Sequence, residues 1–333
     1  MCGYSSTCAT AFLFVSVVVG CGPPDINQAG GTIYIYELAR DRDGVPPQLD
    51  IATKEATVSV LEERLDPIGT RGIHVYFNEA DRLEIAVPSH DESPRPQVQA
   101  LATATGRLQF LVLANRRDHG QLIATAKTAR STEVKKDDTV LGRWVDVVKR
   151  KESGNHTLSI PGDIGVLRNG KSGELVIFST EEIQGMGGGP HVQNHILREK
   201  GITDLQVLVV VEHNAELRFQ SKHLASVSEA VDGMGEPCLE FVTTEEGAEI
   251  LTNVTKANLP EQSAGFHRRL GIVLDDQLLS APRIVSTIKD RGKITGDFTR
   301  QEIQRLARIL QAGQLPVQLS KKPVKTISVD PSP

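Results

Sequence analysis

The stretch Leu270–Leu319, LGIVLDDQLLSAPRIVSTIKDRGKITGDFTRQEIQRLARILQAGQLPVQL, decides the fold of this 333-residue chain. It opens with a short apolar run, Gly271–Leu274, which predicts a buried strand. The acidic pair Asp275–Asp276 follows and predicts a tight reversal, because Asp tolerates a positive φ better than most residues. A second short strand through Leu278–Leu279 ends at Pro282, because proline cannot donate a strand hydrogen bond.

A helix follows in the same stretch. Thr299 and Glu302 form a capping box, in which each side chain bonds the other residue's backbone N–H. Gly313 ends the helix, and Leu315–Leu319 is predicted to leave it as a strand. One apolar stripe at helical spacing gives the buried face: Ile303, Leu306, Ala307 and Leu310. The stretch therefore predicts a strand-strand-helix-strand unit.

Three segments of this stretch, VLDDQLLSAPRI, ITGDF and TRQEIQRLARILQAGQLP, carry a family resemblance. They resemble, in order and with matching separations, the end of the large periplasmic domain in the SecD family, accessory subunits of the bacterial Sec translocon. The sequence departs from the family pattern at Asp276 (a turn glycine in the family), Asp297 (asparagine) and Gln311 (arginine). The residues that match the motifs are Asp275, Ser280, Ala281, Pro282, Thr295, Gly296, Phe298, Gly313, Leu315 and Pro316.

Composition limits the classes of protein that fit. The chain is long enough for about two domains with their own cores, and 39% of its residues are hydrophobic. The net charge is -5, and the Lys and Arg residues are scattered without an interleaved aromatic platform. We therefore expect no nucleic-acid partner.

The N-terminus resembles an export signal. Ala9–Gly20 is a 12-residue apolar run, which is short for a membrane span but fits the core of a signal peptide. Val18–Cys21 resembles a lipobox and predicts lipidation at Cys21, with residues 1–21 as leader and 22–31 as linker. Met1–Thr10 contains no Lys or Arg, so an uncleaved anchor or a misplaced start codon stays open.

Cysteine usage agrees with this interpretation. Cys2, Cys8 and Cys21 lie in the leader segment, which leaves Cys238 as the unmodified cysteine of the mature chain. The sequence has no disulfide framework and no CxxC pair, so we predict no structural zinc, no thiol redox site and no cofactor.

The region 32–114 predicts a ferredoxin-like βαββαβ unit. Strands are expected at Thr32–Leu38, Ile73–Phe77, Leu83–Val87 and Leu108–Val112, with helices around Val58–Leu65 and Val98–Ala102. The segments GGTIYIYEL, LEERLDPIGT and DRLEIAVP resemble the early periplasmic part of the SecD family.

The rest of the chain divides into three parts. Residues 115–216 are expected to form a β-rich insert with a Gly-rich loop, and 217–319 a second α+β unit of the type called the head in the SecD family. Phe219–Leu251 resembles that head, although Gln220-Ser221 departs from the family's Thr-Gly. Residues 320–333 are expected to be a tail. The predicted fold class is therefore α+β.

In the insert, Asp118 is expected to cap a helix, and short strands are expected at Trp144–Val148, Thr157–Ile160, Leu175–Phe178 and Leu205–Val211.

Five groups were weighed as chemical sites. His191 and His195, at i and i+4, could share a helix face as metal ligands, but a plain surface helix is favoured because no third ligand suggests itself. Gly185–Pro190 resembles a phosphate loop without the following Lys-Ser/Thr, so a simple loop is favoured. Ser280 lacks the G-x-S-x-G elbow of a hydrolase nucleophile.

The other two groups are charged. Asp275–Asp276 could act as paired carboxylates, but solvated turn residues are favoured. His267–Arg269 forms a small basic patch, which is most often a solvated edge. We therefore predict no metal, no catalytic residue and no enzyme activity.

The resemblance implies a protein of the cell envelope that faces the periplasm and assists Sec-dependent export. The implied partners are an unfolded preprotein, components of SecF and SecY type, and the membrane through the N-terminal anchor. An envelope lipoprotein that uses the fold as a scaffold or small-ligand module is the alternative. After Leu319 the sequence SKKPVKTISVDPSP contains no apolar segment. We therefore expect passive or docked action rather than autonomous use of the proton-motive force.

Overall fold

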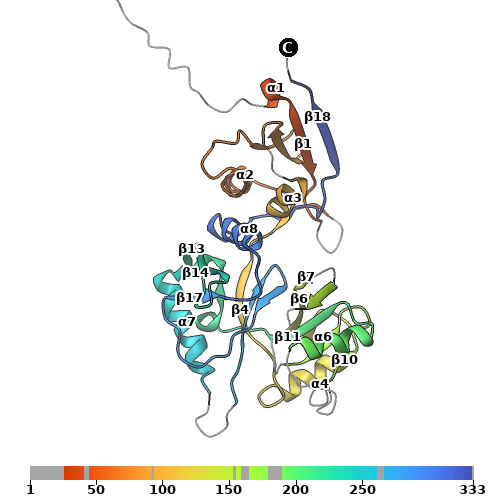
Figure 1. Cartoon of the computed structure of the whole chain (residues 1–333), viewed down its shortest axis with the longest axis vertical. Coiled ribbons are helices and arrows are strands. Elements are labelled where there is room, and N and C mark those ends of the chain that lie inside the picture. Colours follow the sequence, from red (N-terminus) through yellow and green to blue (C-terminus); the bar gives the residue numbers. More distant parts are fainter. Residues whose placement is uncertain are drawn as a thin grey trace, which may run out of the picture.

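The computed structural model describes residues 26–40, 45–91, 94–152, 155–158, 165–178, 190–260 and 266–331. Within these residues the strands form sheets of four, nine, three and two strands. Figure 1 shows the four-stranded sheet at one end of the molecule and the three-stranded and nine-stranded sheets toward the other. The leader predicted at 1–21 lies outside the described residues.

The four-stranded sheet forms the base. Its order is β18 (Lys325–Val329), β1 (Gly31–Tyr36), β3 (Leu83–Pro88) and β2 (His74–Phe77), with antiparallel pairing throughout. The short helix α1 (Ile26–Ala29) precedes β1, while α2 (Ile51–Leu65) and α3 (Arg95–Thr103) contribute to the core. Apolar side chains of α2 and α3 pack against those of β3 in one buried core cluster. It includes Leu61 and Leu65 of α2, Val98 and Leu101 of α3, and Leu83 and Ile85 of β3.

One strand of the predicted βαββαβ unit is elsewhere. Leu108–Val112 forms β4, which pairs in the nine-stranded sheet and not in the base. The edge beside β1 is taken instead by Lys325–Val329, so the region expected to be a tail contributes β18. The prediction of a unit contained within residues 32–114 is wrong in this respect. Periodicity places strands along the chain but does not identify their partners.

The nine-stranded sheet draws on distant parts of the sequence. Eight strands follow one another across the sheet in the order β10-β9-β11-β6-β16-β15-β4-β12, and β5 (Glu133–Lys136) pairs with β6. Besides β4, the strands of this path are β10 (Leu175–Val176), β9 (Leu167–Asn169), β11 (Leu205–Val210), β6 (Thr139–Val147), β16 (Gln277–Ser280), β15 (Leu270–Leu274) and β12 (Phe219–Gln220). Most pairs are antiparallel, but β16 and β6 are parallel. The sheet therefore joins the predicted insert to the strands on either side of it in sequence.

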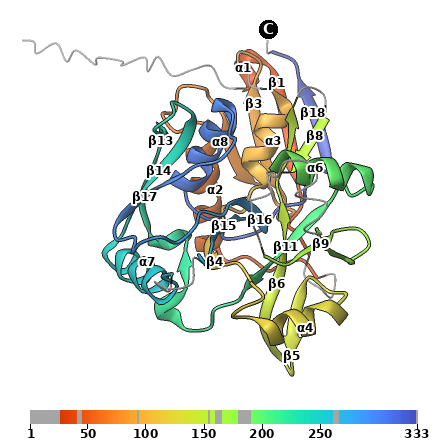
Figure 2. The same ribbon diagram turned by 60° about the horizontal axis from the view of Figure 1, so that its bottom comes forward.

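Other elements of the insert lie around this sheet. They are α4 (Gly120–Thr128), α6 (Pro190–Glu199) and a separate hairpin of β7 (Lys149–Glu152) and β8 (Asn155–Leu158). Figure 2 shows α4 and β5 together at the end of the molecule away from the base. The helix expected to begin at Asp118 has His119 at its N-cap position instead. Each predicted insert strand overlaps an observed one: β6, β8, β10 and β11.

The three-stranded sheet and two helices form the head. Its order is β13 (Leu224–Val231), β14 (Pro237–Thr243) and β17 (Arg291–Ile294). The 3₁₀ turns η1 (Ala215–Leu217) and η2 (Ser221–His223) lead into it, and α7 (Glu245–Ala257) and α8 (Arg300–Gln311) cover it. The Thr244 side chain caps α7 by accepting the Gly247 N–H at 3.0 Å. The predicted capping box of Thr299 and Glu302 is confirmed.

The predicted strand-strand-helix-strand unit is divided between two sheets. Its hairpin, β15–β16, belongs to the nine-stranded sheet, whereas α8 packs on β13 and β14. The strand expected at Leu315–Leu319 is not formed; Leu319 makes a single bridge with Leu38. Pro316 lacks an N–H, which disfavours a continuous ladder there.

Helix α8 packs on both sides. The predicted stripe of Ile303, Leu306, Ala307 and Leu310 lies in the core of the head, and Ile309 lies in the core of the base. The helix contacts β13 and β14 on one side and α2 and α3 on the other. Figures 1 and 2 both place α8 between these groups. A single helix therefore carries much of the packing between head and base.

Candidate functional site

Three motif residues, Asp275, Gly313 and Leu315, meet around the connection from α3 to β4. Arg64, at the end of α2, is fully buried. Its Nη1 donates to the carbonyl oxygens of Leu101 at 3.2 Å and of Ala104, and its Nη2 donates to those of Thr105 at 3.3 Å and Gly313 at 2.7 Å. Burial lowers the pKa of the Arg64 guanidinium to about 10, and the nearby Asp275 carboxylate opposes this shift. Arg64 therefore ties α2, the connection and the end of α8 together.

Asp275 holds the same connection from the other side. Its carboxylate accepts the backbone N–H of Arg107 at 2.8 Å and of Gly106 at 3.2 Å, and it accepts the Thr105 hydroxyl. The Leu315 N–H donates to the Thr105 carbonyl at 2.7 Å. The interpretation of Asp275 as a solvated turn residue is therefore wrong: its carboxylate satisfies donors at the start of β4.

Asp276 behaves differently from its neighbour. It is exposed, has φ +64°, and occupies the position of the family's turn glycine. Its carboxylate lies 2.6 Å from Arg107 Nη2 and 3.0 Å from Arg143 Nη1. These ion pairs link the β15–β16 turn to β4 and β6. Asp275 and Asp276 therefore each stabilise the fold. Because they bind different partners, the two carboxylates do not form a shared acid–base pair.

The remaining motif residues are structural in the same sense. The Ala281 carbonyl accepts a 2.7 Å hydrogen bond from Arg269 Nη1, and the Pro282 carbonyl accepts the Leu270 N–H at 3.0 Å. Phe298 is buried in the head core, and a Cβ at Gly296 would lie 3.0 Å from the Phe298 ring. The others lie close by: Ser280 ends β16 half-buried, Thr295 is exposed after β17, and Pro316 is exposed after α8.

The head presents a free strand edge. Within the described chain β13 pairs only with β14, so its other side is an edge of the sheet. Gln311 Nε2, from the end of α8, donates to the Val227 carbonyl at 2.7 Å and covers part of this edge. Beyond it the strand runs to the hairpin tip, where Val231 is 55% and Met234 86% exposed.

The histidine pair and the Gly-rich segment, for which a plain surface helix and a simple loop were favoured, give no assembled site among the described residues. His195 lies on α6, and its Nε2 is 3.3 Å from Glu199 Oε1 in an i,i+4 pair. The His191 side chain and residues 185–189 of the Gly-rich segment lie outside what the structure describes. No group of three or more His, Cys, Asp or Glu residues with metal-binding geometry occurs in the described parts of the chain.

His223 is a buried titratable group that the sequence analysis missed. Its Nδ1 accepts the Gln220 N–H at 3.0 Å, and its Nε2 lies 3.6 Å from Glu246 Oε1 without a hydrogen bond. Burial lowers the pKa of His223, and the Glu246 carboxylate opposes this shift. A Cβ at Gly247 would lie 2.4 Å from the His223 carbonyl oxygen, so glycine permits the close approach of η2 and α7. The segment FQSKH offered no spacing that marks such a residue.

The predicted basic patch is only partly a solvated edge. Arg268 donates to both Asp118 carboxylate oxygens, at 2.8 and 3.1 Å, and to the Leu259 carbonyl at 2.9 Å. Partial burial is the largest single influence on the pKa of Asp118 and would raise it. Hydrogen bonds from Arg268 and Asn115 act in the other direction, and the pKa is lowered overall. Two of the three patch residues are thus tied to the fold, since Arg269 bonds Ala281.

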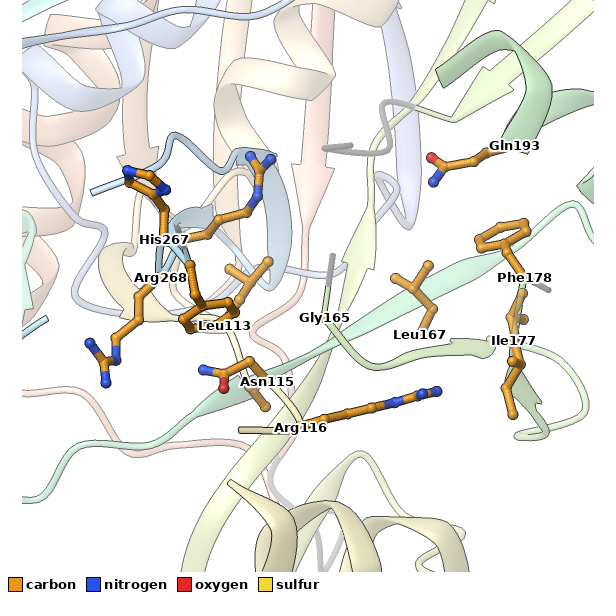
Figure 3. A pocket seen from close by; sticks show the side chains of 14 residues that line it. Leu113, Asn115, Arg116, Gly165, Leu167, Ile177, Phe178, Gln193, His267 and Arg268 are labelled. Atoms are coloured by element: carbon orange, nitrogen blue, oxygen red, sulfur yellow. The ribbon is translucent and has the colours of Figure 1, made fainter. Parts of the chain in front are cut away.

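A cavity of about 360 Å³ opens beside this patch. It lies between residues 113–116, the β9–β10 hairpin and residues 266–269, with Gln193 of α6 on its rim. Figure 3 shows the Arg116 side chain extended along one side of the cavity toward Ile177, with Leu113 and Leu167 on the opposite side. The lining therefore combines apolar side chains with polar and cationic groups.

Comparison with known families identifies the head. Residues 195–317 match the family model described as the SecDF P1 head subdomain. That range contains α7, α8, the three-stranded sheet and the β15–β16 hairpin.

Curated relatives agree. SecD of Aquifex aeolicus is 45% identical over 86 residues, which is 26% of this chain and 16% of that protein. SecD of Rickettsia typhi is 28% identical over 193 residues, 56% of this chain and 36% of that protein. Both are named protein translocase subunit SecD. These matches therefore span well under half the length of the curated relatives.

Solved structures show the same fold. A crystal structure of SecDF in a super-membrane-facing form aligns with a TM-score of 0.52 and 18% identity over 92% of this chain and 31% of its own. A second structure, described as a membrane component SecDF that enhances protein export, aligns with a TM-score of 0.50 and 16% identity over 86% of this chain and 96% of its own. The mixed α+β arrangement of several sheets is thus that of the SecDF periplasmic domains.

None of the helices in the described residues combines the length and apolar character that a membrane crossing needs. The family model and the relatives point to the same similarity. Residues 195–317 of this chain are thus similar to the SecDF P1 head subdomain, and the described chain as a whole resembles a SecD periplasmic domain.

Proposed function

We propose that this protein assists Sec-dependent protein export by contacting an unfolded preprotein with its head. The observation that carries the proposal is the match of residues 195–317 to the P1 head subdomain, combined with the free edge of β13 in that region. Relatives named protein translocase subunit SecD support the pathway. The proposed role is non-enzymatic.

The edge of β13 suits a partner without a fixed sequence. An exposed strand edge offers backbone N–H and C=O groups, which pair with the backbone of any extended chain. Before the tip residue Val231, the exposed side chains of β13 are small or acidic: Ala225, Ser226, Ser228 and Glu229. Small side chains leave the edge accessible, so the main chain would supply most of the affinity.

The hairpin tip adds a small apolar surface. Val231 and Met234 are exposed, whereas Phe219, Leu239 and Phe241 are buried in the head core. Asp232 shapes the turn by accepting the N–H groups of Met234 at 2.8 Å and Glu236 at 3.0 Å. A flexible methionine side chain adapts to different apolar partners. Within Phe219–Val242, the apolar contact with preprotein is therefore proposed for the tip.

The proposal includes a place in the cell. Lipidation at Cys21 would hold the protein at the membrane, facing the periplasm, where components of SecF and SecY type would be its neighbours. The protein would act as a tethered binder or docked on a translocon that supplies the energy.

Site-specific crosslinking tests the proposal. A photo-reactive residue at Ser228 of β13 is expected to crosslink a stalled, exporting preprotein in cells, while one at the exposed Glu55 of α2 is expected to give no such product. Equal labelling from both positions, or none from Ser228, would contradict contact through the head.

A binding measurement with purified protein complements it. We expect the full chain to bind a reduced, unfolded protein but not its folded form. The double substitution Val231→Ser and Met234→Ser should weaken binding several-fold, because it removes the exposed apolar groups. Ile68→Ser removes an equally exposed apolar group from the base and serves as the control. If only the control variant Ile68→Ser lost affinity for the unfolded protein, the contact with preprotein would lie on the base and not at the hairpin tip.

A further inference from the structure

We infer that the cavity between residues 113–116, the β9–β10 hairpin and residues 266–269 binds a carboxylate attached to an apolar group. The inference goes beyond the proposed export role. The lining segments 113–116 and 165–178 also lie outside the region that matches the P1 head. The volume of about 360 Å³ falls within the usual range of small-ligand sites, about 300–1,000 Å³.

Arg116 supplies the charge that a carboxylate would meet. It is exposed, and its side chain makes no hydrogen bond or ion pair with the residues that the structure describes. In Figure 3 its guanidinium reaches along the cavity toward Ile177. The planar guanidinium can bind both oxygens of a carboxylate at once.

The backbone beside Arg116 is held in place. The Asn115 side-chain oxygen accepts the N–H of Arg117 at 3.1 Å and of Asp118 at 2.9 Å, and the Asn115 N–H donates to His119 Nδ1 at 3.2 Å. This turn fixes the position from which the Arg116 side chain starts. A fixed starting point lowers the conformational entropy lost when a ligand binds.

The other two arginines of the cavity are already engaged. Arg268 is paired with Asp118, and Arg269 bonds the Ala281 carbonyl. They contribute positive potential at the margin, whereas Arg116 remains for a ligand. The excess of cationic groups favours an anion over a neutral ligand.

Apolar side chains line part of the cavity. Leu113 and Leu167 are buried beneath it, Phe178 is half-buried, and Ile177 is 58% exposed. Phe266 also lines it and lies under Arg117, with 5.6 Å from the guanidinium carbon to the ring centroid. Covering Ile177 and Phe178 would remove apolar surface from water, a gain of about 25 cal/mol per Å².

A second cavity extends the site. It also has a volume of about 360 Å³ and shares Arg116, Gly165, Leu167, Val176 and Ile177 with the first. Ile123 adds apolar lining there, and Lys127 adds another positive charge. Arg116 and Ile177 thus line both cavities, so an extended apolar chain could continue from one into the other.

The single tryptophan gives a local readout. Trp144 shares a core cluster with Ala114, Ile123 and Val166, all of which line one of the two cavities. Binding should therefore change the Trp144 fluorescence of the purified full chain. Two probes distinguish the source of the carboxylate: dodecanoate below its micelle concentration, and a short peptide that ends in Leu-Phe with a free C-terminus. The matched probes without the charge are dodecan-1-ol and the amidated peptide.

We expect fluorescence and calorimetry to show binding of at least one of the two charged probes. The corresponding uncharged probe should bind at least about tenfold more weakly. Arg116→Gln should weaken the same probe by about tenfold or more, and Ile177→Ser by several-fold. Arg218→Gln, at an exposed arginine that lines neither cavity, should leave the affinity unchanged.

The pattern of binding identifies the source. Binding of dodecanoate alone assigns the site to free fatty acids, and binding of the peptide alone assigns it to polypeptide C-termini. Absence of binding by both charged probes overturns the inference. Equal affinity of charged and uncharged probes, or unchanged affinity in Arg116→Gln, overturns it as well. Circular dichroism of each variant confirms that the fold is retained.

Discussion

Arg64 and Gly313 lie 249 positions apart in the chain, and Arg64 Nη2 donates a 2.7 Å hydrogen bond to the Gly313 carbonyl oxygen. The same guanidinium donates to one carbonyl of α3 and to two carbonyls of the α3–β4 connection. We expect Arg64→Met to lower the free energy of unfolding by about 3 kcal/mol or more, because it leaves several buried carbonyls without a donor. Thermal and urea unfolding measure the loss.

The control for this substitution is Arg82→Met. Arg82 pairs with Glu37 at 3.0 Å on the surface, where both side chains are well exposed. Exposed pairs contribute about 0–1 kcal/mol, so this variant should unfold close to the parent. Similar losses in the two variants would contradict the special role of Arg64.

Substitutions at Asp275 and at Asp276 are predicted to differ in their cost to the free energy of unfolding. Asp275→Ala removes the acceptor for two backbone N–H groups and the Thr105 hydroxyl, and should cost about 2–3 kcal/mol of unfolding free energy. Asp275→Asn keeps one acceptor oxygen and should cost less. Asp276→Asn removes only exposed ion pairs and should cost no more than about 1 kcal/mol. Chemical denaturation of the three variants gives the order, and an equal cost at both positions would disprove it.

Helix α8 predicts sensitivity on two faces. Leu306→Asp places a charge in the head core and Ile309→Asp places one in the base core, and each should cost more than about 3 kcal/mol. Gln304→Asp, at an exposed position of the same helix, should change stability by less than about 1 kcal/mol. An Ile309→Asp melting temperature equal to the parent's would show that α8 does not pack on the base.

Two histidines, buried His223 and half-buried His119, predict that stability depends on pH. Burial lowers the pKa of His223 and of His119 below the ordinary histidine value of 6.5. Between the folded pKa and 6.5 the unfolded chain binds more protons than the folded chain. The free energy of unfolding should therefore fall as the pH drops below about 6.5, and level off below the folded pKa.

His223→Asn tests this origin. An asparagine oxygen can accept the Gln220 N–H that His223 Nδ1 accepts now, but it does not titrate. Stability measured by urea at a series of pH values should depend less steeply on pH in His223→Asn, and least in the double variant with His119→Asn. A slope as steep as the parent's in the double variant would assign the dependence to other groups.

Lipidation predicts a fractionation result. Cys21→Ser removes the only thiol at the lipobox and should release the protein from membranes or block its processing. Mass spectrometry of the N-terminus checks the diacyl or triacyl modification directly. Unchanged mass and unchanged membrane association would favour an uncleaved anchor.

The sequence predicted local structure well where the signal was local. The capping box at Thr299 and the stripe on α8 are confirmed. Both Asp275 and Asp276 have positive φ, as a tight turn requires. These features depend on neighbours within a few residues, so their residues are sufficient to predict them.

Long-range partners were not predictable in the same way. Nothing within β4 shows that it leaves the base sheet, because a strand buried in either sheet has the same alternation. Similarly, the burial of Arg64 depends on carbonyls from three segments. The meeting of Asp275, Gly313 and Leu315 around Thr105 and Gly106 required the structure.

The pairing of β1 with β18 has a mechanical consequence. Gly31 lies opposite Val329, so the beginning of one strand and the end of the other sit side by side (Figure 1). A force that pulls residues 31 and 329 apart would load their ladder one rung at a time, as in opening a zipper, instead of shearing all rungs together. Most β18 side chains are exposed or half-buried, so this strand would peel away first while β1, β3 and β2 remained paired.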